Sequence, residues 1–181
     1  MAILVVAATE RELACVEGAE TLCCGIGPVE AALQTARALA ERRPEAVLQV
    51  GIAGSHRLEP PALVLGSQAI YCDVLDAANT LPRVDRVDPD ASLLAAAREA
   101  LPEAHVLPIA TCARVGGGAG CDVEAMEGFG VLRAAELARV PALELRSISN
   151  APGEADRTRW RIPDALELLA QAVPRVLATL R

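Results

Sequence analysis

The stretch Ala46-Val-Leu-Gln-Val-Gly-Ile-Ala-Gly54 decides the fold that we expect for this chain. Residues 46–50 are a short and mainly apolar run, which is typical of a β-strand that is buried on both faces. Gly51 follows directly and Gly54 three residues later. The strand is therefore expected to run into a glycine-rich turn that leaves room for a ligand near the backbone. Such a strand is typical of a parallel sheet in an α/β protein.

Two further strands are expected before this stretch. Residues 3–8 are a continuous apolar run, and residues 20–24 form a strand that leads through Gly25-Ile-Gly-Pro28 into a helical pattern over residues 29–39. Proline is common at the first position of a helix. The glycine turn can present backbone amides to a ligand, although a lone Gly-x-Gly is more often only a tight connection.

Strands and helices continue to alternate in the rest of the chain. Strands are expected at residues 62–74 (bent at Gly66), 106–113 and 141–149, helices at 91–100, 126–138 and 164–180, and a loop or flap at 76–90. We therefore predict an α/β protein, a single domain over residues 1–181, with a mainly parallel (mixed) twisted central sheet flanked by helices. If the strands are neighbours, their glycine turns and the stretch 124–130 meet at one end of the sheet.

The composition limits what the protein can be. Hydrophobic residues make up 52% of the 181 residues and aromatic residues only 2%, so the core must be aliphatic. The formal net charge is −7, from 24 acidic and 17 basic side chains, and all of the basic ones are arginine. A nucleic-acid partner is therefore not expected.

Cysteine and histidine usage argues against a metal centre. The six cysteines form no Cys-x-x-Cys pair, and His56 and His105 stand alone, so we expect neither a metal nor a cofactor. The adjacent Cys23 and Cys24 are interpreted as small core residues. The first residues read as a strand and not as a signal peptide, and no apolar run reaches membrane-spanning length. We expect a soluble, cytoplasmic protein with reduced thiols and no membrane partner.

The stretch Cys121-Asp-Val-Glu-Ala-Met-Glu-Gly-Phe-Gly130 has the composition of a site. It places Glu124, Met126 and Glu127 where an extended run gives way to a helix, and its glycines leave space beside the backbone. Before it, residues 115–120 are interpreted as a flexible glycine connection. Thr9-Glu-Arg-Glu12 fits a helix capping box, which is the favoured interpretation of Glu12 from its spacing alone.

Several of these segments together resemble one enzyme family. The motif Val123-Glu-Ala-Met-Glu-Gly128, the segment Leu143-Glu-Leu-Arg-Ser-Ile-Ser-Asn150 and Trp160 resemble the futalosine hydrolases. That family belongs to the superfamily of nucleoside phosphorylases and of methylthioadenosine/S-adenosylhomocysteine nucleosidases. The resemblance extends to Glu12 and to the glycine motifs after residues 24 and 50, and it covers most of the chain.

The resemblance implies hydrolysis of the N-ribosidic bond of futalosine, which gives hypoxanthine and dehypoxanthine futalosine in an alternative route to menaquinone. It implies that Glu12 is the base that activates water and that Glu127 accepts a ribose hydroxyl. Such cleavage passes through a positively charged ribose, which a nearby carboxylate stabilises. The implied substrate-binding residues are Ile52, Ala53, Gly54, Val123, Glu124, Ala125, Met126 and Trp160. For Glu124, a structural or solvated carboxylate is an equal alternative.

Asn150 distinguishes between purine bases. Nucleosidases that act on adenine resemble this chain but have aspartate at the matching position. An amide can donate hydrogen bonds to N7 and to a 6-oxo group, whereas an ionised carboxylate suits a 6-amino group. Asn150 therefore favours hypoxanthine as the leaving base. Without its flanking residues, it would be interpreted only as an asparagine that ends a strand.

Other functions within the superfamily stay open. Phosphorolysis is disfavoured because acids follow the first strand where phosphate would bind. Arg11 is interpreted as a surface charge and Arg146 as a buried or interfacial structural charge. Residues 113–121 are shorter than in the relatives and lack the aromatic that stacks on the purine; Phe129 is interpreted as core. The alternatives are a nucleosidase for another purine nucleoside, of the methylthioadenosine type, and a silent nucleoside-binding relative. The resemblance also implies a homodimer or larger homo-oligomer.

Overall fold

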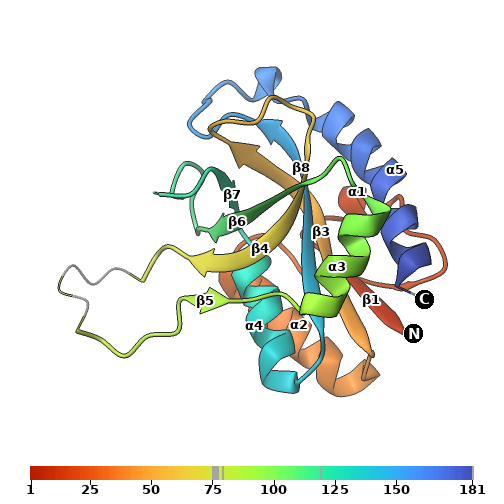
Figure 1. Ribbon diagram of the computed structural model, residues 1–181. Coiled ribbons are helices and arrows are strands. Elements are labelled where there is room, and N and C mark those ends of the chain that lie inside the picture. Colours follow the sequence, from red (N-terminus) through yellow and green to blue (C-terminus); the bar gives the residue numbers. More distant parts are fainter. Residues whose placement is uncertain (75–77, 79, 119, 181) are drawn as a thin grey trace.

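The computed structural model describes residues 1–74, 78, 80–118 and 120–180. Strands and helices alternate along this part of the chain (Figure 1). The elements are β1 (Ile3–Ala7), α1 (Glu10–Leu13), β2 (Glu20–Cys23), α2 (Pro28–Arg42), β3 (Ala46–Ser55), β4 (Leu63–Tyr71), β5 (Arg86–Val87), α3 (Ala91–Ala100), β6 (His105–Thr111), β7 (Val123–Ala125), α4 (Gly128–Ala138), β8 (Ala142–Asn150), the 3₁₀ turn η1 (Arg157–Arg159) and α5 (Ile162–Thr179).

The eight strands of this part of the chain form one mixed sheet. β1 pairs with β2 and β3, β3 with β8, and β6 with β4 and β7, all in parallel. β3 with β7, β4 with β8 and β4 with β5 are antiparallel. The α/β class with a mixed sheet is confirmed, but the prediction of a simple twisted sheet is wrong. β3, β8, β4, β6 and β7 pair in a closed ring, which makes a barrel.

Two long strands bend and so allow the ring to close. The pairing of β3 with β8 shifts register between Ala53 and Gly54, and that of β4 with β6 shifts between Gly66 and Gln68. Shifts of this kind bend a strand and increase its twist. The bend that we predicted at Gly66 is therefore present. The side chains that the five ring strands point inward include a small apolar cluster, formed by Ala53, Val64, Ile109, Val123, Ala125 and Ile148.

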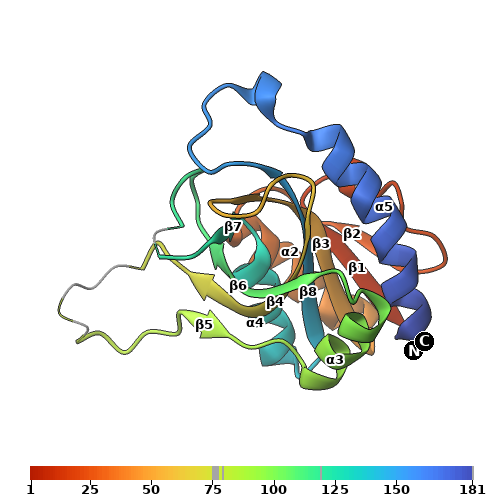
Figure 2. The same ribbon diagram turned by 45° about the horizontal axis from the view of Figure 1, so that its top comes forward.

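Helices cover the sheet on two sides, as Figures 1 and 2 show. On one side, α3 and α5 pack with α1 on leucines of β3 and β8, such as Leu48 and Leu143. On the other side, α2 and α4 pack on β1 through residues such as Leu39, Val131 and Leu132. Each fully buried leucine or valine stabilises the fold by about 1.5–3 kcal/mol, so an aliphatic core suffices without aromatic residues.

The helices α2 and α4 approach each other closely at Gly130. A Cβ atom at this position would lie 2.5 Å from the Pro28 carbonyl oxygen at the start of α2. Phe129, the neighbouring residue, stacks on Tyr71 with ring centroids 5.2 Å apart and packs against the core on this side. The interpretation of Phe129 as a core residue agrees with this placement.

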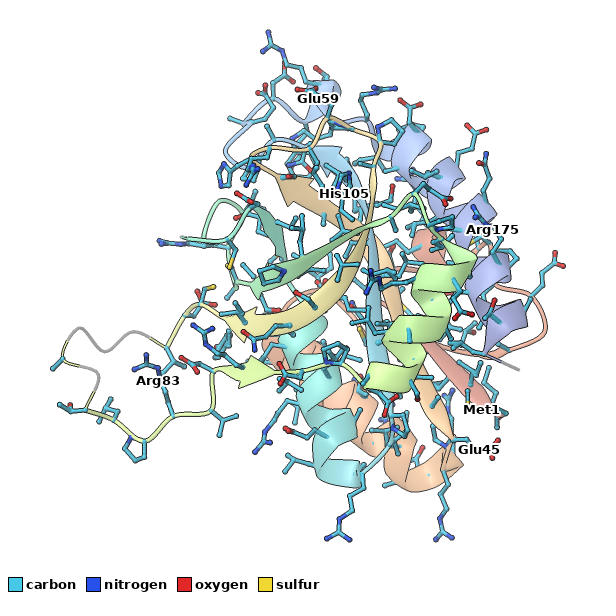
Figure 3. The ribbon with its side chains drawn as sticks, in the orientation of Figure 1. Met1, Glu45, Glu59, Arg83, His105 and Arg175 are labelled. Atoms are coloured by element: carbon cyan, nitrogen blue, oxygen red, sulfur yellow. The ribbon has the colours of Figure 1, made fainter. Side chains whose placement is uncertain are left out.

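The ends of the chain lie side by side near the last helix (Figures 1 and 2). Arg175 of α5, labelled in Figure 3, forms an ion pair with Glu103 after α3 and donates to the Ala100 carbonyl. These exposed contacts connect α5 to the end of α3 on the same side of the sheet.

Three further sequence expectations differ from the structure. Gly51 and Gly54 lie inside β3, so the predicted turn after residue 50 is wrong, and the strand runs on to Ser55. A short strand, β5, occupies the end of the predicted loop 76–90, of which residues 76, 77 and 79 lie outside the described part. Cys24 is buried in the core as expected, whereas Cys23 is exposed.

In the described residues no helix has both the length and the apolar character needed to cross a membrane. Within the same ranges, no three carboxylate, thiol or imidazole groups gather in a way that could hold a metal ion.

Candidate active site

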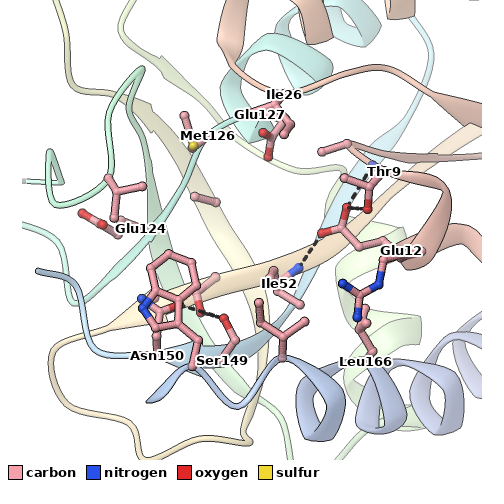
Figure 4. Close-up of a pocket in the computed structure, with 18 of the residues that line it drawn as sticks. Thr9, Glu12, Ile26, Ile52, Glu124, Met126, Glu127, Ser149, Asn150 and Leu166 are labelled. Carbon is pink, nitrogen blue, oxygen red and sulfur yellow. Dashed lines mark hydrogen bonds between the residues drawn. The ribbon is translucent and has the colours of Figure 1, made fainter. Parts of the chain in front are cut away.

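A cavity of about 430 Å³ opens at the end of the barrel where β3, β7 and β8 finish (Figure 4). It is lined by residues from α1, β3, β7, β8, α5 and the segments next to them. They are Ala8, Thr9, Arg11, Glu12, Ile26, Ile52, Ala53, Gly54, Arg114, Val115, Glu124, Ala125, Met126, Glu127, Ser149, Asn150, Arg157, Trp160, Ile162 and Leu166. Carboxylates and apolar side chains thus share one wall, which suits a ligand with both a sugar and a flat ring.

The carboxylate of Glu12 is held in the cavity wall by three hydrogen bonds. The Thr9 amide and hydroxyl donate to its Oε2 atom over 3.0 and 2.8 Å. The Ile52 amide of β3 donates to its Oε1 atom over 2.9 Å. Glu12 therefore caps α1 as predicted and at the same time faces the cavity, with 6% of its surface exposed.

Glu127 approaches the same region from the start of α4. Its Oε1 atom accepts from the Gly27 amide over 3.1 Å, and its Oε2 atom lies 3.3 Å from the Arg146 guanidinium. The side chain is 4% exposed and lines the cavity. The glycine turn before α2 therefore uses an amide to orient a carboxylate of the protein itself.

A buried arginine joins the two sides of this acidic wall. Arg146 of β8 is 1% exposed and forms ion pairs with Glu127 and Glu144, and it also donates to the Ile52 carbonyl over 3.3 Å. Burial opposes its charge, but the carboxylates of Glu144, Glu127 and Glu12 outweigh burial and raise the pKa of Arg146 above its usual value. The prediction of a buried structural charge is confirmed.

Gly51 makes room for this arrangement. A Cβ atom there would lie 2.4 Å from an Arg146 guanidinium nitrogen and 2.7 Å from Glu12 Oε1. The glycine after the predicted strand thus serves the approach of two charged side chains to β3, and not a turn.

Asn150 ends β8 at the opposite wall of the cavity (Figure 4). Its Oδ1 atom accepts from the Ser149 hydroxyl over 2.8 Å, and its Nδ2 atom donates to the Ala151 carbonyl over 3.1 Å. A primary amide has two N–H groups, so one of them remains for a ligand. Because the Ser149 hydroxyl donates to Oδ1, it fixes the orientation of the amide and thus the position of the Nδ2 donor.

Trp160 covers the cavity beside Asn150 from the segment before α5. Its indole Nε1 donates to the Glu154 carbonyl over 3.0 Å, and the Arg157 guanidinium lies 5.5 Å from the ring centroid. The ring is thereby held in one orientation while it lines the cavity. A fixed aromatic ring is a suitable surface for an apolar part of a ligand.

Glu124 is engaged by the glycine segment that precedes it. Gly116 donates its amide to Oε1 over 2.6 Å, and Gly118 donates its amide to Oε2 over 2.9 Å. Glu124 therefore has the structural role that we considered as an alternative, although it also lines the cavity. The predicted glycine connection thus supplies two amides that hold this carboxylate.

The structure brings together ten of the eleven residues predicted for the site. Val123 is the exception: it is fully buried in the apolar cluster inside the ring and does not line the cavity. The sequence did not point to Ile26, Ser149, Arg114 or Val115 as lining residues. Alternation along β8 would place Ser149 on the face opposite to Asn150, and only the end of the strand turns both toward the cavity.

This fold and this cavity define a class of protein. Residues 21–180 match the family model of the phosphorylase superfamily, and the chain belongs to this superfamily. The futalosine hydrolase of Streptomyces coelicolor is 36% identical over 194 residues, covering 91% of this chain and 80% of that protein.

Solved structures share the fold. A futalosine hydrolase mutant of Helicobacter pylori superimposes with a TM-score of 0.88 at 19% identity, covering 98% of this chain and 99% of that one. A methylthioadenosine/S-adenosylhomocysteine nucleosidase of Colwellia psychrerythraea, in complex with adenine, gives a TM-score of 0.86 at 21% identity, covering 99% and 96%.

Proposed function

We propose that this protein hydrolyses the N-ribosidic bond of futalosine and releases hypoxanthine, a step toward menaquinone. The observation that carries the proposal is the buried carboxylate of Glu12, held by the Thr9 and Ile52 amides in the wall of the cavity. A fixed carboxylate next to a sugar can take a proton from water as the water attacks the anomeric carbon. The identity to the Streptomyces coelicolor futalosine hydrolase supports the substrate.

Glu127 accepts a hydroxyl of the ribose in this proposal. Its two oxygens already accept hydrogen bonds from the Gly27 amide and the Arg146 guanidinium. Each carboxylate oxygen has a second lone pair, which can accept a hydrogen bond from the sugar. Met126, the residue before it, lines the same cavity and packs on the sugar or the base. Glu127 and Glu12 together stabilise the positive charge that develops on the ribose.

Asn150 donates its remaining N–H group to N7 of the leaving base, and Trp160 covers the bound nucleoside. A donor at N7 stabilises the purine as it departs with negative charge. Ile52, Ala53 and Gly54 of β3, with Ala125 of β7, form the surface on which the nucleoside rests.

Replacing Asn150 by aspartate is expected to change the preference for the base. The ratio of kcat/KM for futalosine to that for methylthioadenosine should fall by about tenfold or more, because an ionised carboxylate cannot donate to N7 or to the 6-oxo group. Both constants are measured by chromatography of the free base. An Asn150→Ala control removes the donor without adding a charge, and losses of kcat/KM that are equal for the two substrates would contradict a role in base recognition.

Water is the proposed nucleophile, and phosphate is the alternative within the superfamily. The test incubates purified protein with futalosine with and without inorganic phosphate and follows both products. We expect hypoxanthine and unphosphorylated dehypoxanthine futalosine at the same rate in both cases. A rate that depends on phosphate, with a sugar phosphate as product, would overturn hydrolysis.

We also propose that two or more copies associate. Ile26 in the turn before α2 is 65% exposed and lines the cavity, and Val29 and Leu33, one turn apart on α2, are 67% and 63% exposed. A second copy of this chain would cover them. A monomer mass in light scattering at working concentration would contradict this proposal.

We also propose that the protein is located in the cytoplasm. Its six free thiols are usual for a protein in a reducing compartment, and cell fractionation tests this location.

A further inference from the structure

Among the described residues, Glu144 is the one fully buried carboxyl that has no part in the mechanism described so far. It lies on β8, two residues before Arg146, and is 0% exposed. Its Oε1 atom accepts from the Arg146 Nε atom over 2.8 Å. Its Oε2 atom has no hydrogen-bond partner among the described residues.

This contact holds the guanidinium of Arg146 at its Nε atom. Its other nitrogens reach Glu127 and the Ile52 carbonyl, and the Ile52 amide in turn holds Glu12. Through the guanidinium and the backbone of Ile52, Glu144 is thus connected to both Glu127 and Glu12, which line the cavity. A guanidinium donates in a fixed fork, so its orientation is set by the partner of Nε as much as by the others.

Two glycines make room for the Glu144 side chain. A Cβ atom at Gly128 would lie 2.2 Å from Glu144 Oε2 and 2.3 Å from Oε1, so the glycine allows α4 to begin directly over this carboxyl. On the other side, Gly66 of β4 comes so close that a Cβ atom would lie 3.3 Å from the Glu144 Cβ atom.

The charges around Glu144 favour its neutral form. Three buried carboxyls, Glu12, Glu127 and Glu144, share one guanidinium, and a carboxylate oxygen without a donor is costly in such a place. Burial raises the pKa of the Glu144 carboxyl, and the negative charge of Glu127 acts in the same direction, whereas Arg146 acts against both. Cys24 adds no charge, since burial raises its pKa to about 12.

A second buried polar side chain lies on the neighbouring strand. Gln49 pairs in register with Glu144 in the parallel pair of β3 and β8, so both side chains point to the same side of the sheet. Gln49 is also fully buried, and neither its Oε1 nor its Nε2 atom has a partner among the described residues.

We propose that Glu144 is a positioning residue that, as a neutral carboxyl, holds Arg146 in the orientation from which it reaches Glu127 and Ile52. The reaction then depends on the hydrogen bond to Arg146 and not on a negative charge at residue 144. This inference rests on the proposed hydrolysis for its kinetic test but not for its spectroscopic one.

The kinetic test compares Glu144→Gln with Glu144→Leu on futalosine. Glutamine is neutral and keeps an acceptor for Arg146. The kcat value should therefore stay within about threefold of that of the unchanged protein, and the dependence of kcat/KM on pH should keep its shape. Leucine removes the acceptor, so kcat should fall by at least about tenfold with KM little changed, because a small displacement of a catalytic group is costly. Leu145→Ala, the next residue on β8, is the control for lost packing on the opposite face.

Equal kcat values per folded protein in Glu144→Leu and Leu145→Ala would overturn the proposal, as would a loss in Glu144→Gln as large as in Glu144→Leu. Infrared spectroscopy tests the neutral form without substrate. The unchanged protein should show the carbonyl stretch of a protonated carboxyl at neutral pH, and Glu144→Gln should lack it. Persistence of that band in Glu144→Gln, or its absence from both proteins, would also overturn the proposal, even if futalosine were not the substrate.

Discussion

Replacing Glu12 by glutamine is expected to lower kcat for futalosine by about 10²–10⁴-fold, because the reaction loses the base that takes a proton from water. The fold should be retained, since glutamine can also close the capping box with Thr9. The measurement is hypoxanthine release at saturating futalosine, together with the melting temperature of each protein.

Glu10→Gln is the matched control for this experiment. Glu10 lies on the same short helix but is exposed and does not line the cavity. Its kcat should equal that of the unchanged protein. If Glu12→Gln were as active as Glu10→Gln, Glu12 would be only a helix cap.

Replacing Arg146 by methionine is expected to have the largest effect on stability. The change leaves Glu127 buried without its cation and Glu144 without its hydrogen-bond donor, and removing one partner of a buried ion pair costs about 3–5 kcal/mol. For a domain of this size, the melting temperature should fall by roughly 6–20 °C. Thermal unfolding followed by circular dichroism measures this shift.

Arg175→Met provides the comparison at an exposed ion pair. Arg175 pairs with Glu103 at the surface, where such pairs contribute only about 0–1 kcal/mol. Its melting temperature should therefore change little. A similar small change for Arg146→Met would show that the buried carboxyls are not held by this arginine.

Much of the fold could be predicted from local patterns. The apolar run at residues 3–8, the proline at the start of α2 and the helix at 91–100 gave the alternation of strands and helices, because each depends on nearby residues alone. The closure of the ring could not be predicted in this way. It depends on pairing between strands distant in sequence, such as β3 with β7, and β7 is only Val123–Ala125.

The residues of the site were recognisable because their motif resembles a family, whereas spacing alone favoured a helix cap for Glu12. The structure shows that the two interpretations of Glu12 are compatible, since one carboxylate caps α1 and faces the cavity. The engagement of Glu124 by Gly116 and Gly118 was not predictable, because a glycine run is usually flexible and its amides find this carboxylate only through tertiary contact.

We expect this cavity to cleave a 6-oxopurine nucleoside, and a direct comparison of substrates tests this activity. Purified protein is incubated in parallel with futalosine, methylthioadenosine and inosine, and kcat/KM is determined from the free base released. We predict hypoxanthine from futalosine at the highest kcat/KM of the three. Adenine from methylthioadenosine at a higher kcat/KM, or no base from any of the three while futalosine still raises the melting temperature, would contradict the account.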